Sequence, residues 1–156
     1  SLPPPEKIVT GLKLKVNFSE WWNDIECTYI DCGSPHIVVM IDQLKFISTL
    51  EDVNVEEWGR NVRMHKDLMP EGANVNFVKY TDGNKIEVRT YERGVERETL
   101  ASGTGSISSA IASSLIYDLI PPIEVLVRSK KTITVDFKNK TGSIFDLTLS
   151  GNAEKI

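Results

Sequence analysis

One segment of the chain combines an acid, a base and a glycine-rich turn at the start of a predicted helix. Glu92 and Arg93 lead into Ser102-Gly103-Thr104-Gly105, and apolar residues at helical spacing continue to Leu119 before Pro121-Pro122 stops the helix. A helix N-terminus favours an anion, and glycines let a ligand approach the backbone closely. The pattern is typical of a carboxylate or phosphate site with Ser102 beside it, although a Ser-Gly pair can also simply cap a core helix.

The elements that must position this segment are mostly strands. Apolar patterns predict strands at residues 12–18, 24–32, 37–41, 75–80, 85–91, 123–127, 132–137 and 144–149, a helix over 54–64 and a turn over 21–24. The helix over 103–119 has small uncharged residues opposite its apolar stripe, where a solvent-facing helix usually carries Lys or Glu. This composition predicts a helix enclosed by a curved sheet of about seven strands.

Four motifs occur in the order found in a known enzyme family. They are Gly33-Ser34-Pro35-His36, the stretch from Gly59 to Phe77 that ends in Asn74-Val75-Asn76-Phe77, the segment from Glu92 to Gly105, and Ser150-Gly151-Asn152-Ala153-Glu154. Together they resemble the C-terminal half of the diaminopimelate epimerases, which are cofactor-independent amino-acid epimerases. The resemblance implies the α+β half-fold of that family, a mostly antiparallel, barrel-like sheet around one central helix. It assigns residues 11–156 to a C-terminal domain and residues 1–10 to a linker or to the end of a missing N-terminal domain.

The resemblance also implies a mechanism and a set of site residues. In this family one thiolate removes the α-proton of the substrate and a second thiol on the opposite face returns a proton, so that no cofactor is needed. Ser102 occupies the position of the second thiol, Glu92 would assist proton transfer, and His36 matches the histidine that backs a thiol. Substrate-binding roles fall to Ser34, Asn74, Arg93, Gly103 and Thr104. The last two would hold the α-carboxylate through backbone N–H groups, and a guanidinium suits a carboxylate.

The sequence departs from the family pattern at several points. Ser102 replaces the thiol, either naturally or through an engineered Cys→Ser substitution, and a hydroxyl without a strong base is a far weaker proton acceptor. Ser34 stands where the family has Asn, and residues 95–98 make a loop one residue longer than usual. The half that carries the first thiol is absent, and the chain ends at Ile156, before the family's last strand finishes. We therefore expect an isolated C-terminal domain that is inactive on its own.

Two other functions stay open from the sequence alone. One is a related amino-acid racemase of the same fold, and the other is a non-catalytic binding or scaffold module that has lost the thiol. The expected partners are a small amino-acid substrate, the missing N-terminal domain and a second copy of the chain in a homodimer. Adjacent Trp21 and Trp22 suggest an exposed subunit or interdomain contact, or alternatively a ring that plugs one end of the barrel.

Composition excludes several other classes of protein. The net charge of −4 and the pI of about 5.2 argue against a nucleic-acid surface, and no apolar run approaches the ~20 residues that span a membrane. The start of the sequence lacks the features of a signal peptide, so a cytoplasmic location is expected. Cys27 and Cys32 lie at odd spacing on one predicted strand, and His36 and His65 have no ligand cluster around them. Neither a disulfide nor a metal site is therefore expected.

Overall fold

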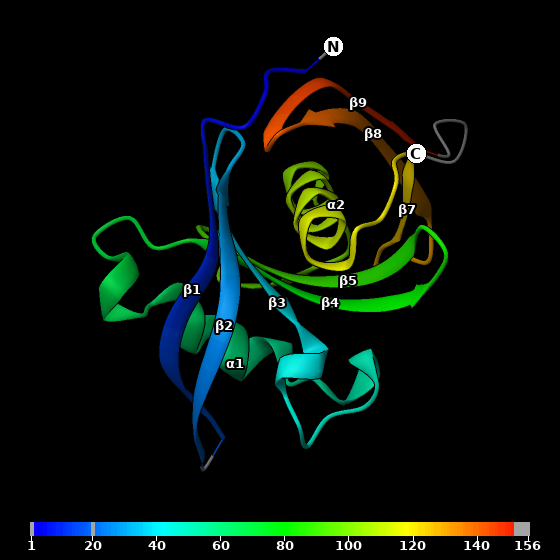
Figure 1. Cartoon of the computed structure of the whole chain (residues 1–156). Helices are drawn as coiled ribbons and strands as arrows, with labels where there is room; N and C mark the ends of the chain where they lie inside the picture. The colour runs from blue at the N-terminus through cyan, green and yellow to red at the C-terminus, as the bar shows by residue number, and fades with distance from the viewer. Residues whose placement is uncertain (1, 20, 152–156) are drawn as a thin grey trace.

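The computed structural model describes residues 2–19 and 21–151, whose strands form one nine-stranded sheet (Figure 1). The order is β1-β2-β3-β4-β5-β7-β8-β9, with the short β6 paired to β5. The strands are β1 (Lys7–Phe18), β2 (Trp21–Asp31), β3 (Pro35–Met40), β4 (Asn74–Asp82), β5 (Lys85–Glu92), β6 (Arg97–Thr99), β7 (Ile123–Leu126), β8 (Thr132–Lys140) and β9 (Ser143–Gly151). The helices are α1 (Val55–Arg63) and α2 (Gly103–Tyr117), with 3₁₀ turns at Ile41–Gln43, Leu50–Asp52 and Lys66–Leu68.

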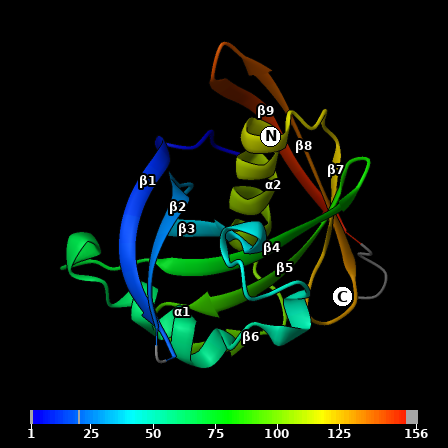
Figure 2. The same ribbon diagram turned by 60° about the horizontal axis from the view of Figure 1, so that its bottom comes forward.

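Both α-helices lie in connections between parallel neighbours of the sheet. The β3/β4 and β5/β7 pairs are parallel, whereas every other pair of neighbouring strands is antiparallel. A parallel pair needs a crossover connection, and α1 and α2 supply these two crossovers. They pack on opposite faces of the sheet, with β3, β4 and β5 between them (Figure 2).

The two faces explain the continuous apolar run of β3. Ile37 and Val39 belong to the core cluster on the α1 face, whereas Val38 and Met40 belong to the cluster on the α2 face. Because successive side chains of a strand point to opposite faces, a strand covered on both sides needs apolar residues at every position. The same alternation puts His36 on the α2 face.

The helix α2 lies inside the curve of the sheet, as its composition predicts (Figure 1). All residues from Gly105 to Ser114 are buried, including the small serines opposite the apolar stripe. The helix starts one residue after the Ser102 cap and ends at Tyr117, and the C-cap residue Asp118 adopts a left-handed conformation with φ of 56°. The predicted α+β fold with a curved sheet around one central helix is therefore confirmed, and the sheet does not close into a full barrel.

Close packing of α2 on β4 requires a glycine at position 105. A Cβ atom added to Gly105 would lie 2.6 Å from Asn76 Oδ1 and 3.0 Å from Ser102 Oγ. Since both oxygens already accept hydrogen bonds, neither can move away freely. We expect the Gly105→Ala substitution to lower the free energy of unfolding by about 1–3 kcal/mol, the usual range for overpacking. Urea denaturation measures this loss, and an unchanged midpoint would contradict the close approach.

Several local predictions are wrong in detail. Trp21 to Asp24 do not form a turn, because β2 begins at Trp21 and pairs it with Phe18 of β1. The left-handed conformation of Ser19, with φ of 62°, places the reversal of the chain earlier. The first strand starts at Lys7 rather than residue 12 and carries a bulge between Val9 and Leu12. The short β6 and the 3₁₀ turns were not predicted, because three-residue elements leave no periodic pattern.

Other predictions agree with the structure. The Asn54 side chain caps α1 by accepting a hydrogen bond from the N–H of Glu57. Cys27 and Cys32 are free and pack in the clusters on opposite faces of the sheet. The tryptophan rings at positions 21 and 22 are about two-thirds exposed, so neither plugs the barrel. None of the described helices is both long and apolar enough to cross a membrane.

Candidate functional site

The start of α2 offers unpaired backbone donors. Ser102 Oγ accepts a hydrogen bond from the N–H of Gly105 at 3.0 Å, and the carbonyl of Ser102 accepts one from the N–H of Ser106. Among the described residues, none accepts a hydrogen bond from the N–H of Gly103 or Thr104. Two free N–H groups at the positive end of a helix form a site that an anion can occupy. The two roles that the sequence left open for Ser102-Gly103, a helix cap and an anion site, are therefore compatible. Ser102 caps the helix while the N–H groups of Gly103 and Thr104 stay available.

His36 lies fully buried next to this helix start. Its Nε2 is 2.9 Å from Thr104 Oγ1 and 3.2 Å from Ser34 Oγ, and its Nδ1 is 2.9 Å from Asn76 Nδ2. Burial, with a smaller contribution from the charge of Arg93, lowers the pKa of His36 from 6.5 to about 4. The imidazole is therefore neutral at pH 7.

The lowered pKa of His36 has a measurable effect on stability. Between pH 6.5 and about 4 the unfolded chain binds a proton at this residue that the folded chain does not bind. The free energy of unfolding should therefore fall as the pH decreases through this window, by about 3 kcal/mol in total. Urea unfolding of the original chain and of a His36→Gln variant at pH 7 and pH 4.5 isolates this contribution. Equal pH dependence in the two proteins would contradict it.

Asn74 ties three segments of the site together. Its Nδ2 donates to the carbonyl of Pro35 at 3.1 Å and lies 3.4 Å from Ser34 Oγ, and its Oδ1 accepts a hydrogen bond from the N–H of Arg93 at 2.7 Å. The β3/β4 register makes this possible, because Asn74 is the direct neighbour of His36. The Asn74 amide thus holds the loops on both sides of it.

Glu92 and Arg93 lie side by side at the end of β5 and are both partly exposed. The Arg93 guanidinium donates to the carbonyl of Glu71 at 3.1 Å. No described residue forms a hydrogen bond or ion pair with the Glu92 carboxylate. In the longer loop, the Glu96 carboxylate forms an ion pair with Arg63 at 2.8 Å.

The structure brings together most of the predicted site residues. Hydrogen bonds link Ser34, His36, Asn74, Arg93 and Thr104. Ser102 and Gly103 join them through the first turn of α2, and Glu92 joins only as the neighbour of Arg93. The substrate and proton-transfer roles assigned to these eight residues remain predictions.

Sequence reasoning missed two buried polar residues of the same site. Asn76 is fully buried and contacts His36, and Thr90 donates to Asn76 Oδ1 at 2.8 Å. Asn76 belongs to the Asn74-Val75-Asn76-Phe77 motif, but the family resemblance assigns a role only to Asn74. Its position two residues after Asn74 on one strand puts both on the same face, and that spacing could have identified it.

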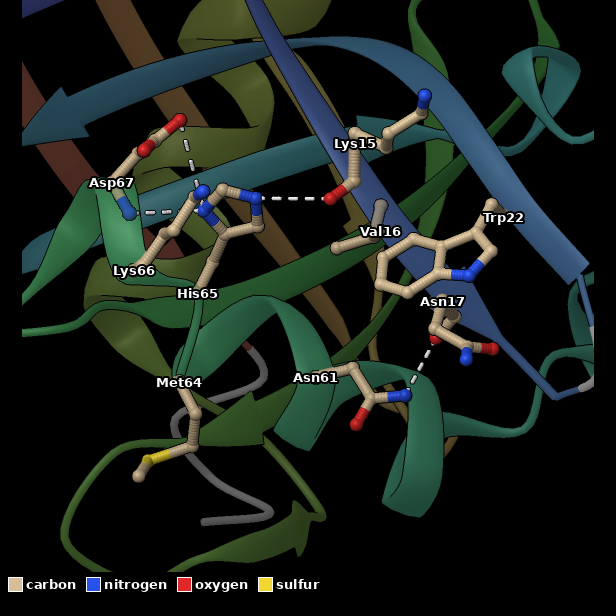
Figure 3. Close-up of a pocket in the computed structure, with 9 residues that line it drawn as sticks. All are labelled: Lys15, Val16, Asn17, Trp22, Asn61, Met64, His65, Lys66 and Asp67. Atoms are coloured by element: carbon tan, nitrogen blue, oxygen red, sulfur yellow. Dashed lines mark hydrogen bonds and ion pairs between the residues drawn. The ribbon is translucent and has the colours of Figure 1, made fainter.

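The cavity drawn in Figure 3 lies elsewhere. It measures about 600 Å³ and lies between β1 and the end of α1, lined by Lys15, Val16, Asn17, Trp22, Asn61, Met64, His65, Lys66 and Asp67. None of the predicted site residues lines it. The imidazole of His65 is already occupied, because Nε2 donates to the carbonyl of Lys15 and Nδ1 accepts from the N–H of Asp67. In residues 2–19 and 21–151, no group of three or more His, Cys, Asp or Glu side chains could hold a metal ion.

Comparison with known proteins decides the family. The family model described as Diaminopimelate epimerase matches residues 28–145, a range that contains every predicted site residue. The chain belongs to the diaminopimelate epimerase family. A diaminopimelate epimerase from Aquifex aeolicus is 42% identical over 130 residues, which cover 82% of this chain and 43% of the relative. One from Chlorobaculum tepidum is 34% identical over 154 residues, covering 98% of this chain and 53% of the relative. The chain thus spans about half the length of these curated diaminopimelate epimerases.

Solved structures support the same fold. A probable proline racemase from Agrobacterium radiobacter K84 superposes with a TM-score of 0.60 at 15% identity, covering 94% of this chain and 48% of that one. A hydroxyproline epimerase from Agrobacterium vitis gives 0.62 at 16% identity, covering 94% and 47%. At these identities the likeness shows the fold alone. The chain therefore shares its fold with about half of each of these two proteins.

Proposed function

We propose that this chain is the C-terminal half of a cofactor-independent diaminopimelate epimerase, which interconverts LL- and meso-diaminopimelate for lysine and peptidoglycan synthesis in the cytoplasm. The observation that carries the proposal is the gathering of the family's site residues around the start of α2, within the matched range. A missing N-terminal half, with the opposing thiol, would complete the cleft. A homodimer is a further assembly that we propose for this chain.

The chemistry of the site suits an amino acid. The free N–H groups of Gly103 and Thr104 and the helix dipole would bind the α-carboxylate and stabilise the charge that develops on it when the α-proton leaves. The Glu92 carboxylate, which has no hydrogen-bond or ion-pair partner among the described residues, is available for the ammonium group or for proton transfer. The Arg93 guanidinium keeps donors beyond the one spent on Glu71 and suits a second carboxylate. No step in this scheme uses pyridoxal phosphate.

Ser102 limits what this chain can do alone. In this proposal its hydroxyl replaces the second thiol of the family, and its Oγ accepts a hydrogen bond from the N–H of Gly105. Among the described residues, no strong base lies within hydrogen-bond distance of this hydroxyl, so it cannot readily accept a proton from carbon. We therefore propose that the isolated chain binds substrate and does not epimerise it.

Two parallel measurements test this function. Calorimetry measures binding of LL-diaminopimelate, and proton NMR in D₂O follows loss of its α-proton signal over hours at substrate excess. Binding without exchange is the expected result. Exchange by the unmodified chain would contradict a half-site, and absence of binding would contradict the function. Tighter binding of proline or 4-hydroxyproline than of diaminopimelate would instead favour a related racemase of the same fold.

A further inference from the structure

A buried chain of hydrogen bonds crosses the sheet and ends at the start of α2. Thr90 Oγ1 on β5 donates to Asn76 Oδ1 on β4 at 2.8 Å. Asn76 Nδ2 lies 2.9 Å from His36 Nδ1 on β3, and His36 Nε2 lies 2.9 Å from Thr104 Oγ1 on α2. Thr90, Asn76 and His36 are each at least 95% buried, so water does not compete for the contacts among these three side chains.

The register of the sheet builds this chain. Asn76 is the direct neighbour of Thr90 in the antiparallel β4/β5 pair, and His36 and Asn76 lie diagonally in the parallel β3/β4 pair. All three side chains point to the α2 face. The close approach of Gly105 to Asn76 then seats the first turn of α2 against the chain.

The direction of every bond follows from its partners. Asn76 Nδ2 also approaches the carbonyl of Ile37 at 3.3 Å, and a carbonyl can only accept. The nitrogen of the amide therefore faces His36, so His36 Nδ1 accepts and the single imidazole proton lies on Nε2. That proton is donated to Thr104 Oγ1, the nearer of its two hydroxyl partners. Asn74 Nδ2, at 3.4 Å from Nε2, donates to the Pro35 carbonyl instead.

We propose that Asn76 and Thr90 are positioning residues that hold His36 as its Nε2–H tautomer, which makes the Thr104 hydroxyl a donor toward the anion at the start of α2. Because Thr104 Oγ1 already accepts a hydrogen bond from the Nε2–H of His36, its own hydroxyl proton is free to be donated to a ligand. Hydrogen bonds aligned in one direction also strengthen one another. The site then presents three hydrogen-bond donors, which are the N–H groups of Gly103 and Thr104 and the hydroxyl of Thr104. It therefore favours a carboxylate over a ligand group that must itself donate. Only the identity of that carboxylate rests on the proposed function.

The unmodified chain gives the first test. The protein contains two histidines, so long-range ¹H–¹⁵N spectra of a ¹⁵N-histidine sample at pH 7 resolve both tautomers. We expect His36 to carry its proton on Nε2. His65, whose Nε2 donates to the Lys15 carbonyl, is an internal reference for that tautomer. A proton on Nδ1 of His36 would overturn the proposal whatever the protein binds.

Substitutions give the second test. In an Asn76→Asp variant the carboxylate can only accept, so the proton of His36 should move to Nδ1 while His65 stays unchanged. Thr104 must then donate to Nε2, and binding of meso-diaminopimelate should weaken about tenfold, the loss of about one hydrogen bond. A Thr104→Val variant should show a similar loss with the tautomer retained, and Thr104→Ser should bind normally. These two variants also serve if Asn76→Asp does not fold.

The results separate this inference from the proposed function. If His36 is the Nε2–H tautomer but neither the original chain nor any variant binds diaminopimelate, the proposed function fails and the positioning role stands. If diaminopimelate binds and Thr104→Val binds it as tightly as the original chain, the donor role of Thr104 fails and the function stands. An unchanged tautomer in a folded Asn76→Asp variant would overturn the role of Asn76.

Discussion

A cysteine introduced by the Ser102→Cys substitution should ionise near neutral pH, whereas the two native cysteines should not. The thiolate would accept the N–H of Gly105, as the Ser102 hydroxyl does, at the positive end of α2. Helix N-termini of this kind lower a cysteine pKa from about 8.5 into a range of about 3.5–7.5. Burial, assisted by the charge of Glu26, instead raises the pKa of Cys27 to about 12. Burial also raises the pKa of Cys32, despite a hydrogen bond with Ser108.

The expected difference in reactivity is large. At pH 7 the introduced thiol should react with iodoacetamide on the order of 10³-fold faster than Cys27, after allowance for the lower nucleophilicity of a less basic thiolate. Mass spectrometry of timed samples assigns each site. A Ser143→Cys variant is the matched control, because Ser143 is exposed and begins a strand rather than a helix. If the rates at both positions rise with pH around the same midpoint near 8.5, α2 does not activate a thiol at position 102.

Replacing Arg89 by Leu should cost about 3–5 kcal/mol of folding free energy, the usual loss when one partner of a buried ion pair is removed. The Arg89 guanidinium binds both carboxylate oxygens of Glu98 at 2.7 Å and also donates to the carbonyls of Leu50 and Val53. These contacts fasten β6, which leads into Ser102, to β5 and to the turn before α1. The substitution would leave the Glu98 carboxylate, whose side chain is 16% exposed, with Arg128 at 3.6 Å as its remaining cation among the described residues.

Arg128 provides the control for this prediction. It lies 3.6 Å from the same Glu98 carboxylate and 3.3 Å from Glu51, but its side chain is 35% exposed. An exposed pair of this kind contributes about 1 kcal/mol or less, so Arg128→Leu should change stability little. Urea denaturation of both variants gives the comparison. Equal losses would show that the Arg89 network does not hold this part of the fold.

The sequence was sufficient for features that depend on local pattern. The small uncharged residues of α2 and the prolines after it predicted a buried helix and its end. The alternating segments at residues 75–80 and 85–91 predicted the strands β4 and β5, which pair as neighbours in the sheet. Each of these signals is contained in about 20 residues, so no information about distant contacts was needed.

The remaining features depend on contacts between distant segments. Which strands become parallel neighbours is set by the crossover helices, and no local pattern in β3 or β7 records it. The motifs identified His36 and Asn74 as site residues, but Asn76 and Thr90 acquire a role only through the register of three strands. The turn predicted over residues 21–24 is wrong because the local sequence does not show that Trp21 and Trp22 pair with Phe18 and Asn17 of β1.

The most direct test of the central claim is an amide-resolved NMR titration of the unmodified chain with meso-diaminopimelate. Pentane-1,5-diamine, which has the same diamine skeleton without the two carboxylates, is the control ligand. We predict that the largest shifts occur at the amides of Gly103 and Thr104, with Arg93 also affected, and that the diamine leaves the first two unchanged. Shifts confined to the cavity beside Trp22, or equal responses to both ligands, would contradict a carboxylate site at the start of α2.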